Sequence, residues 1–182
     1  MNQALLLIDL QNDYFPGGAM ELAGSTEAGV QAGKLLEVFR SKKLPIVHIQ
    51  HVALKPGATF FLPNTRGAEF QPSAAPAKGE TVFRKHYPNS FSETPLLEHL
   101  RKQKISRLVI AGMMTHMCVD TTTRAASDLG FDCVLAHDAC ATKSLSFAGV
   151  VVSAKDVQAA YLAAIDGSFA KVQTVEELCP TL

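Results

Sequence analysis

The sequence has no excess of charge of either sign, no long hydrophobic run and no paired-cysteine motif. Its 182 residues include 17 lysines and arginines against 17 aspartates and glutamates, so the formal net charge is zero. Without a basic stretch, the chain lacks the surface that releases counterions from nucleic acid or from an anionic membrane. We therefore expect neither nucleic acid nor a membrane as a partner.

The first residues, MNQALLLIDLQNDY, have no basic segment, and their apolar run breaks at Asp9. This pattern is typical of a buried strand and not of a signal peptide or a membrane span. We therefore expect a cytoplasmic protein.

The four cysteines show no C-x-x-C spacing, and a chain of this length has little need of disulfides. We expect four free thiols. Cys133 lies inside the apolar run FDCVLA and is expected in the core, while Cys179 lies near the C-terminus. Cys118 differs from both because it follows a strand and a turn, where a helix is expected to begin.

Short runs of Leu, Ile and Val alternate with segments of helical period, the pattern of repeated βαβ units around a mostly parallel sheet. We expect one α/β domain over residues 1–182, a three-layer sandwich of a six-stranded sheet between helices. The expected strands are Ala4–Leu10, Pro45–Gln50, Thr81–Arg84, Arg107–Ala111, Asp132–Ala136 and Ala170–Gln173. The expected helices are one capped by Ser25 or Thr26 and ending near Ser41, Leu96–Lys102, one beginning near Cys118, and Asp156–Ile165 with Ser153 and Asp156 in capping positions.

A stretch from His51 to Gly79, between the second and third strands, contains four prolines and little periodicity. Loops of this length inside a compact domain are usually functional lids or interface arms. We expect this loop to shape the pocket.

Three reactive side chains fall at the carboxyl ends of expected strands, where open parallel sheets bind their ligands. Asp9 ends the run LLLID, Lys85 follows TVFR, and Cys118 follows VIAGMMTHM. Taken singly, a turn-capping aspartate, a solvated lysine and a small buried thiol explain them as well. Their common place at one edge of the sheet favours a catalytic set.

A thiol at a helix N-terminus beside an ammonium group should have a lowered pKa, because both stabilise the thiolate. A neighbouring carboxylate can accept the thiol proton and return it to a leaving amine. Backbone N–H groups at the helix start can hold an oxyanion. We therefore predict a hydrolase with Cys118 as nucleophile, Asp9 as base and Lys85 as cation.

At these residues the sequence resembles the isochorismatase-like cysteine hydrolases, the superfamily that includes nicotinamidases and N-carbamoylsarcosine amidases. The segments that carry the resemblance are LLLIDLQNDYF, FRKHYPNSF, VIAGMMTHMCVDTTTRAASDLG and VLAHDACAT. It implies Asp9, Lys85 and Cys118 as catalytic residues and a non-proline cis peptide bond between Met113 and Met114. It also implies an oxyanion hole formed by the backbone N–H groups of Met114 and Cys118, and assembly as a homodimer or homotetramer.

We expect no metal or other cofactor. Nicotinamidases bind a metal through an Asp-x-His and further histidines after the second strand, whereas this sequence has VHIQHVAL and no such aspartate. His48 is expected in the core. The residues expected to contact a small-molecule substrate are Phe15, His51, Phe60, Tyr87, Thr115 and His116, with Phe61 and Phe91 as further candidates for apolar walls. Gln11, Asn12 and Asp13 are expected to fix the loop that carries Asp9.

The presence of Cys118 favours hydrolysis of an amide, carbamoyl or related C–N bond, because protonation by the aspartate alone starts the cleavage of a vinyl ether. Vinyl-ether hydrolysis driven by Asp9 is the alternative, and a non-catalytic binding protein on the same fold is another. A thiol redox protein would require a resolving cysteine near Cys118, for which Cys133 and Cys140 are the candidates.

Overall fold

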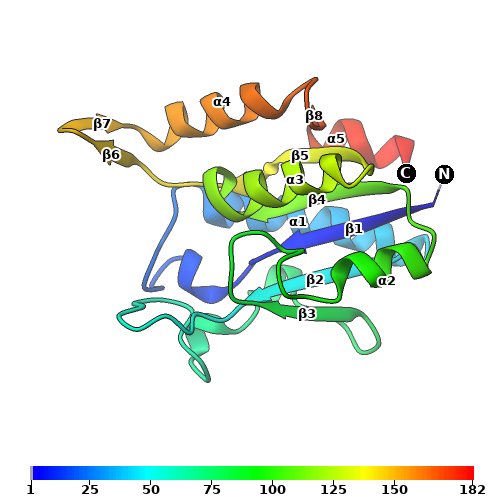
Figure 1. Ribbon diagram of the computed structural model, residues 1–182, viewed down its shortest axis with the longest axis horizontal. Coiled ribbons are helices and arrows are strands. Elements are labelled where there is room, and N and C mark those ends of the chain that lie inside the picture. Colours follow the sequence, from blue (N-terminus) through cyan, green and yellow to red (C-terminus); the bar gives the residue numbers. More distant parts are fainter. Residues whose placement is uncertain (1) are drawn as a thin grey trace.

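Runs rich in Leu, Ile and Val form a central sheet of six parallel strands in the computed structural model, which describes residues 2–182 (Figure 1). The strands are β1 (Gln3–Ile8), β2 (Ile46–His51), β3 (Thr81–Lys85), β4 (Arg107–Met113), β5 (Asp132–Ala141) and β8 (Lys171–Gln173). Their order across the sheet is β3-β2-β1-β4-β5-β8. Side chains on both faces of β1 are fully buried, as expected for a parallel strand covered on both sides.

Helices cover the two faces of this sheet (Figure 1). One core cluster joins the sheet to α1 (Ser25–Ser41) and α5 (Val175–Leu178). A second cluster on the opposite face includes side chains of α2 (Leu96–Lys102), α3 (Asp120–Asp128) and α4 (Ala154–Ile165). The predicted three-layer α/β sandwich is therefore confirmed.

The backbone sets several element boundaries differently from the sequence prediction. The strand predicted to reach Leu10 ends at Ile8, because Asp9 adopts a left-handed φ of 53° that no strand accommodates. Neither Ser25 nor Thr26 caps α1: Gly24 is the N-cap, with φ 71°, and no side chain accepts a capping hydrogen bond there. Ser153 does cap α4, as predicted, by accepting from the backbone N–H of Asp156.

The structure contains short strands and a short helix that the sequence pattern did not predict. A hairpin of β6 (Leu145–Phe147) and β7 (Val150–Val152) extends away from the sheet (Figure 1). Helix α5 is one turn long and is held by a capping box between Thr174 and Glu177. Elements of three or four residues are too short to show a hydrophobic period. None of the helices described within residues 2–182 is long and apolar enough to cross a membrane.

Candidate active site

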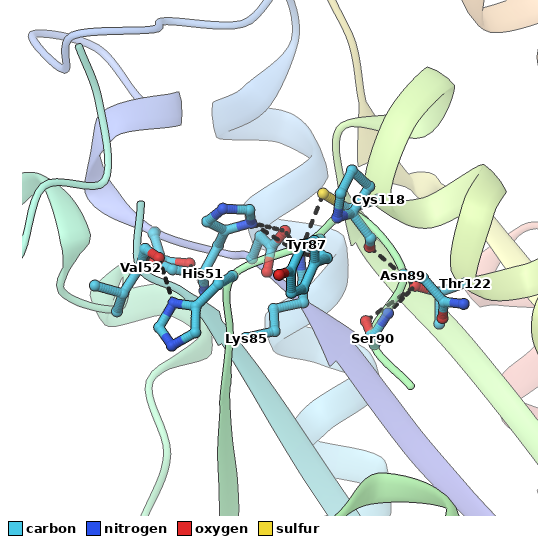
Figure 2. Close-up of polar contacts among 12 residues, drawn as sticks. His51, Val52, Lys85, Tyr87, Asn89, Ser90, Cys118 and Thr122 are labelled. Atoms are coloured by element: carbon cyan, nitrogen blue, oxygen red, sulfur yellow. Dashed lines mark hydrogen bonds and ion pairs between the residues drawn. The ribbon is translucent and has the colours of Figure 1, made fainter. Parts of the chain in front are cut away.

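The structure brings Asp9, Lys85 and Cys118 together at the carboxyl edge of the sheet. Figure 2 shows Lys85 and Cys118 of this group, with His51 beside them. The Lys85 ammonium donates to Asp9 Oδ2 at 2.8 Å and to Cys118 Sγ at 3.2 Å. All three residues are buried, with relative exposures of 0% for Asp9, 1% for Lys85 and 5% for Cys118. One cation therefore links a carboxylate to a thiol in a site that is largely shielded from water.

Each of the three side chains is placed by the end of a different strand. Asp9 follows β1, and its backbone N–H donates to the carbonyl of Ile49 in β2. Lys85 is the last residue of β3. Cys118 lies in a single π-helical turn, Thr115–Val119, between β4 and α3, so the helix predicted to begin near Cys118 begins two residues later.

The turn that carries Cys118 starts from a very close contact between β1 and β4. Gly112 has a φ of +139°, and a β-carbon added to it would stand 2.0 Å from the carbonyl oxygen of Ile8. Only glycine fits at that contact. The peptide bond between Met113 and Met114 is cis, at the position that the resemblance implies.

Lys85 stays charged at this buried position. Burial by itself lowers the pKa of its ammonium, but the electrostatic attraction to Asp9 and Cys118 and the hydrogen bonds to them outweigh that effect, so the pKa is raised. The ammonium also lies 3.1 Å from the carbonyl oxygen of Tyr87 and 3.0 Å from Nδ1 of His51. Contacts with Asp9, Cys118, His51 and the carbonyl of Tyr87 thus fix the position of the Lys85 ammonium.

The pKa of the Cys118 thiol is raised, so the predicted lowering is wrong. Burial is the main cause, the negative charge of Asp9 adds to it, and Lys85 opposes both only in part. The thiol is therefore protonated in the resting site and needs a base in order to react. Asp9 Oδ1 is buried and has no hydrogen-bond partner among residues 2–182, so this oxygen can accept the thiol proton.

A metal ion fits this group of side chains poorly. Asp9, His51 and Cys118 each offer one ligand atom, and the three atoms lie within 4.8 Å of one another. The Lys85 ammonium, however, is within hydrogen-bond distance of all three residues. A fixed positive charge thus already occupies the place that a metal ion would take.

Aromatic rings lie beside the group formed by Asp9, Lys85 and Cys118. The ring of His51 is 5.8 Å from that of Phe61, and Phe61 lies 4.6 Å from Tyr14 and 5.0 Å from Phe60. Tyr87 follows Lys85 by two residues, and its side chain is 38% exposed. Of the predicted substrate contacts, His51, Phe60 and Tyr87 therefore lie in or beside the site, and their contact with substrate stays a prediction.

Tyr14 was missed by the sequence reading. It ends a short 3-10 turn, Asn12–Tyr14, directly after the Asp9 loop, and it is almost fully buried. Burial and the nearby negative charges of Cys118 and Asp9 raise the pKa of its hydroxyl. It lies five residues after Asp9 in the segment LLLIDLQNDYF, but no spacing in the sequence marks it as a buried neighbour of the site.

Three other predicted contacts pack into the surrounding structure. Phe15 is buried, with its ring against Gly29 of α1. The Thr115 hydroxyl donates to the carbonyl of Ala141, and His116 Nδ1 hydrogen-bonds to the hydroxyl of Thr142. Thr115 and His116 thus tie the turn that carries Cys118 to β5 and the residue after it, and a contact of these three residues with substrate stays a prediction.

The residues after Asp9 fasten the long loop to the site. Gln11 donates to the carbonyls of His51 and Ala68 and accepts from the N–H of His51. Asp13 Oδ2 accepts from the N–H of Phe61 at 2.6 Å. These side chains were expected to fix the Asp9 loop itself, and the structure shows them joining that loop to the segment after β2.

The remaining candidates occupy packing positions. His48 is buried, as predicted, and its Nε2 lies 2.8 Å from the carboxylate of Glu80. Phe91 stacks on Phe131 with ring centroids 6.2 Å apart. Neither contact involves the catalytic set.

Known proteins are similar to this chain in sequence and in fold over nearly its whole length. A family model described as the isochorismatase domain matches residues 3–177. The isochorismatase family protein YddQ of Bacillus subtilis is 45% identical over 97% of this chain and 98% of its own length. A crystal structure of an isochorismatase hydrolase from Oleispira antarctica is 47% identical, with a TM-score of 0.95 over 98% of this chain and 96% of that one.

Other relatives carry names that state an activity. The secreted isochorismatase effector Isc1 of Verticillium dahliae is 36% identical over 76% of this chain and 72% of its own length. A nicotinamidase/pyrazinamidase of Mycobacterium tuberculosis is 28% identical over 68% of this chain and 78% of its own length. The similar proteins thus include hydrolases of more than one kind.

Proposed function

The chain belongs to the isochorismatase family, and from that premise we propose that it is a cysteine-dependent hydrolase that cleaves a non-peptide C–N bond of a small amide or carbamoyl compound. The observation that supports this most strongly is the buried Lys85 ammonium, which hydrogen-bonds to both Asp9 and Cys118. Lys85 contacts both the proposed base and the proposed nucleophile, and a carboxylate oxygen of Asp9 lies within 4.8 Å of Cys118 Sγ, an arrangement that suits acyl transfer to a thiol.

In the first step, Asp9 accepts the proton of the Cys118 thiol as the sulfur attacks the substrate carbonyl carbon. Because burial raises the pKa of the thiol, we couple the loss of its proton to the attack. A C–S bond forms, and the π electrons of the carbonyl move to its oxygen. Lys85 stabilises the sulfur as negative charge develops on it.

We assign the oxyanion to the backbone N–H groups of Met114 and Cys118. The N–H groups of Met117 and Val119 in the same turn both donate to the carbonyl of Met114 and are therefore already used. The turn also leads directly into α3, whose N-terminus favours negative charge.

The tetrahedral intermediate then collapses and the C–N bond breaks. The leaving nitrogen takes the proton from Asp9 and departs as ammonia or an amine, which leaves a thioester on Cys118. In the second half, Asp9 removes a proton from water, and the resulting attack releases the acid and returns the thiol. Lys85 holds Asp9 in place throughout.

Vinyl-ether hydrolysis is the second candidate, and one observation favours it. Asp9 Oδ1 is buried and has no hydrogen-bond partner among the residues that the structure describes, so a protonated Asp9 could deliver its proton to a substrate carbon without any help from Cys118. The name of the effector Isc1 points in the same direction. The two candidates differ in their need for the thiol.

The test is hydrolysis of a substrate panel by the wild type and by Cys118→Ala. The panel contains simple amides, ureido acids and nicotinamide, assayed by ammonia release, with isochorismate assayed separately. Ammonia release that disappears in Cys118→Ala supports the proposal. Isochorismate cleavage that persists in Cys118→Ala, without ammonia release from any amide, contradicts it and identifies the vinyl-ether reaction.

A further inference from the structure

His51 adds a fourth polar group to the Asp9, Lys85 and Cys118 set. We propose that His51 is held as the neutral tautomer with its proton on Nε2, and that this N–H donates a hydrogen bond to the substrate. The inference rests on the proposed function and narrows its substrate class: a small amide or carbamoyl compound with a hydrogen-bond acceptor close to the bond that is cleaved.

The tautomer follows from the contact with Lys85. A lysine ammonium can only donate, and Lys85 Nζ lies 3.0 Å from His51 Nδ1, so Nδ1 must be the unprotonated nitrogen that accepts. A neutral imidazole then carries its single proton on Nε2.

The charges around the ring keep it neutral. Burial is the main cause that lowers the pKa of His51 to about 4, followed by the positive charge of Lys85, with smaller contributions of the same sign from His86 and Lys55. Asp9 opposes these effects, but its Oδ2 is 3.9 Å from Nδ1 and already accepts from Lys85.

The Nε2 N–H of His51 has no hydrogen-bond partner in the part of the chain that the structure describes, and its side chain is partly exposed. The two ring nitrogens of an imidazole face diverging directions, so Nε2 points away from Lys85. The side chain is 17% exposed, and Nε2 makes no hydrogen bond within residues 2–182 and is not among the fully buried polar atoms. A ring nitrogen of His51 lies within 4.8 Å of both Cys118 Sγ and an Asp9 carboxylate oxygen, so the imidazole stands next to the thiol that we propose as the nucleophile.

The ring is fixed before any substrate arrives. Gln11 holds both the N–H and the carbonyl of His51, at 2.7 Å and 2.9 Å. Phe61 packs beside the ring, with centroids 5.8 Å apart. A donor held in this way loses little entropy when it binds an acceptor, which makes it suited to select substrates.

The first test is the tautomer itself, measured by NMR on protein labelled with 15N-histidine. At pH 7 we expect the His51 signals to show a protonated Nε2 and an unprotonated Nδ1, with assignment by their loss in His51→Asn. A proton on Nδ1 overturns the inference and leaves the proposed function untouched.

The second test uses aldehydes, which add reversibly to a thiol. Cys118 Sγ forms a bond to the aldehyde carbon, the carbonyl π electrons move to oxygen, and the thiol proton follows to that oxygen, so no oxidant is needed. Benzaldehyde and the three pyridinecarboxaldehydes have the same shape, but the ring nitrogen both offers an acceptor and makes the aldehyde carbon more electrophilic. The preference of a free thiol, 2-mercaptoethanol, for each pyridine aldehyde over benzaldehyde is therefore measured as the reference. We expect the wild type to exceed this reference preference by about three- to tenfold for at least one pyridine isomer.

Two variants separate the donor from the contact with Lys85. In His51→Gln the side-chain amide can place an N–H near the Nε2 position, whereas in His51→Asn an oxygen can replace Nδ1 but no N–H reaches the Nε2 position. We expect the pyridine preference above the free-thiol reference to survive in His51→Gln and to disappear in His51→Asn. The quantity compared is the ratio of the dissociation constants of benzaldehyde and of the pyridine aldehyde for the same variant. A loss of affinity that affects both aldehydes equally cancels in this ratio.

The outcomes are distinct. Equal ratios in the wild type and His51→Asn overturn the donor role even though the adducts form. If adducts form equally well in Cys118→Ala, or do not form in the wild type or any variant, then Cys118 is not the nucleophile, and both the proposed function and the substrate class named above are contradicted. The NMR measurement decides the tautomer of His51 in either case.

Discussion

Replacing Lys85 by methionine tests the physical basis of the site. The change keeps a long apolar stem but removes the ammonium that contacts Asp9, Cys118, His51 and the carbonyl of Tyr87. It leaves the carboxylate of Asp9 buried without a counter-charge. Breaking a buried ion pair from one side typically costs about 3–5 kcal/mol in the free energy of unfolding, and we expect a loss in that range.

A double-mutant cycle separates the pair from each residue alone. Asp9→Asn suits the positive φ at that position and removes the negative charge. If the pair is coupled as the 2.8 Å contact indicates, the double variant is more stable than the sum of the two single losses predicts, by about 1–3 kcal/mol. The assay is urea unfolding followed by circular dichroism at pH 7, with the denaturant slope checked for constancy.

An exposed lysine provides the matched control. Lys34 lies on the solvent side of α1, and Lys34→Met should stay within about 0.5 kcal/mol of the wild type. A Lys85→Met variant as stable as Lys34→Met, or a cycle in which the two losses simply add, would refute the account of Lys85 as the charge that holds the site together.

Three further predictions concern other parts of the site. Burial and the charge of Lys85 lower the pKa of His51 to about 4 in the folded state, against an ordinary value of 6.5, so the folded state binds fewer protons between those values. The free energy of unfolding should therefore fall by roughly 2–3 kcal/mol as the pH drops from 6.5 to 4. Unfolding curves of His51→Gln should show a smaller loss over this range, and an equal loss contradicts the assignment. Gly112→Ala should lower the free energy of unfolding by about 3 kcal/mol or more, measured by thermal unfolding, because the added β-carbon would stand 2.0 Å from the carbonyl oxygen of Ile8. A near-neutral effect would show that β1 and β4 can separate at this contact. Alkylation of Cys118 by iodoacetamide should be slow at pH 7, and its rate should still rise above pH 9, because the pKa of the thiol is raised. The rate is measured by peptide mass analysis in a Cys133→Ser background. A rate that levels off below pH 7 would show that a thiolate is present at rest.

The sheet, and the meeting of Asp9, Lys85 and Cys118 at its edge, could be predicted because their signals are local. Asp9, Lys85 and Cys118 each follow a strand-like run, and parallel strands bring their carboxyl ends to one edge. The geometry of that edge then follows from the order of the strands.

What the sequence reading missed depends on tertiary surroundings. The thiol pKa was predicted with the wrong sign because the helix-terminus argument takes no account of burial, which the structure shows to be the main cause. The contact between His51 and Lys85 joins the ends of two strands that are 34 residues apart in sequence, and no local pattern marks it. Tyr14 was overlooked because a tyrosine in a turn has no distinctive spacing, although its burial against Phe61 is clear in the structure.

The central claim is that Cys118 forms a covalent bond to the substrate during turnover. The most direct measurement is the intact mass of the protein, quenched in acid while it turns over an amide that the panel identifies as a substrate. The account predicts a wild-type species heavier by the acyl group, mapped to Cys118 and absent from Cys118→Ala. Turnover at the wild-type rate by Cys118→Ala, with no mass added to either protein, would contradict it.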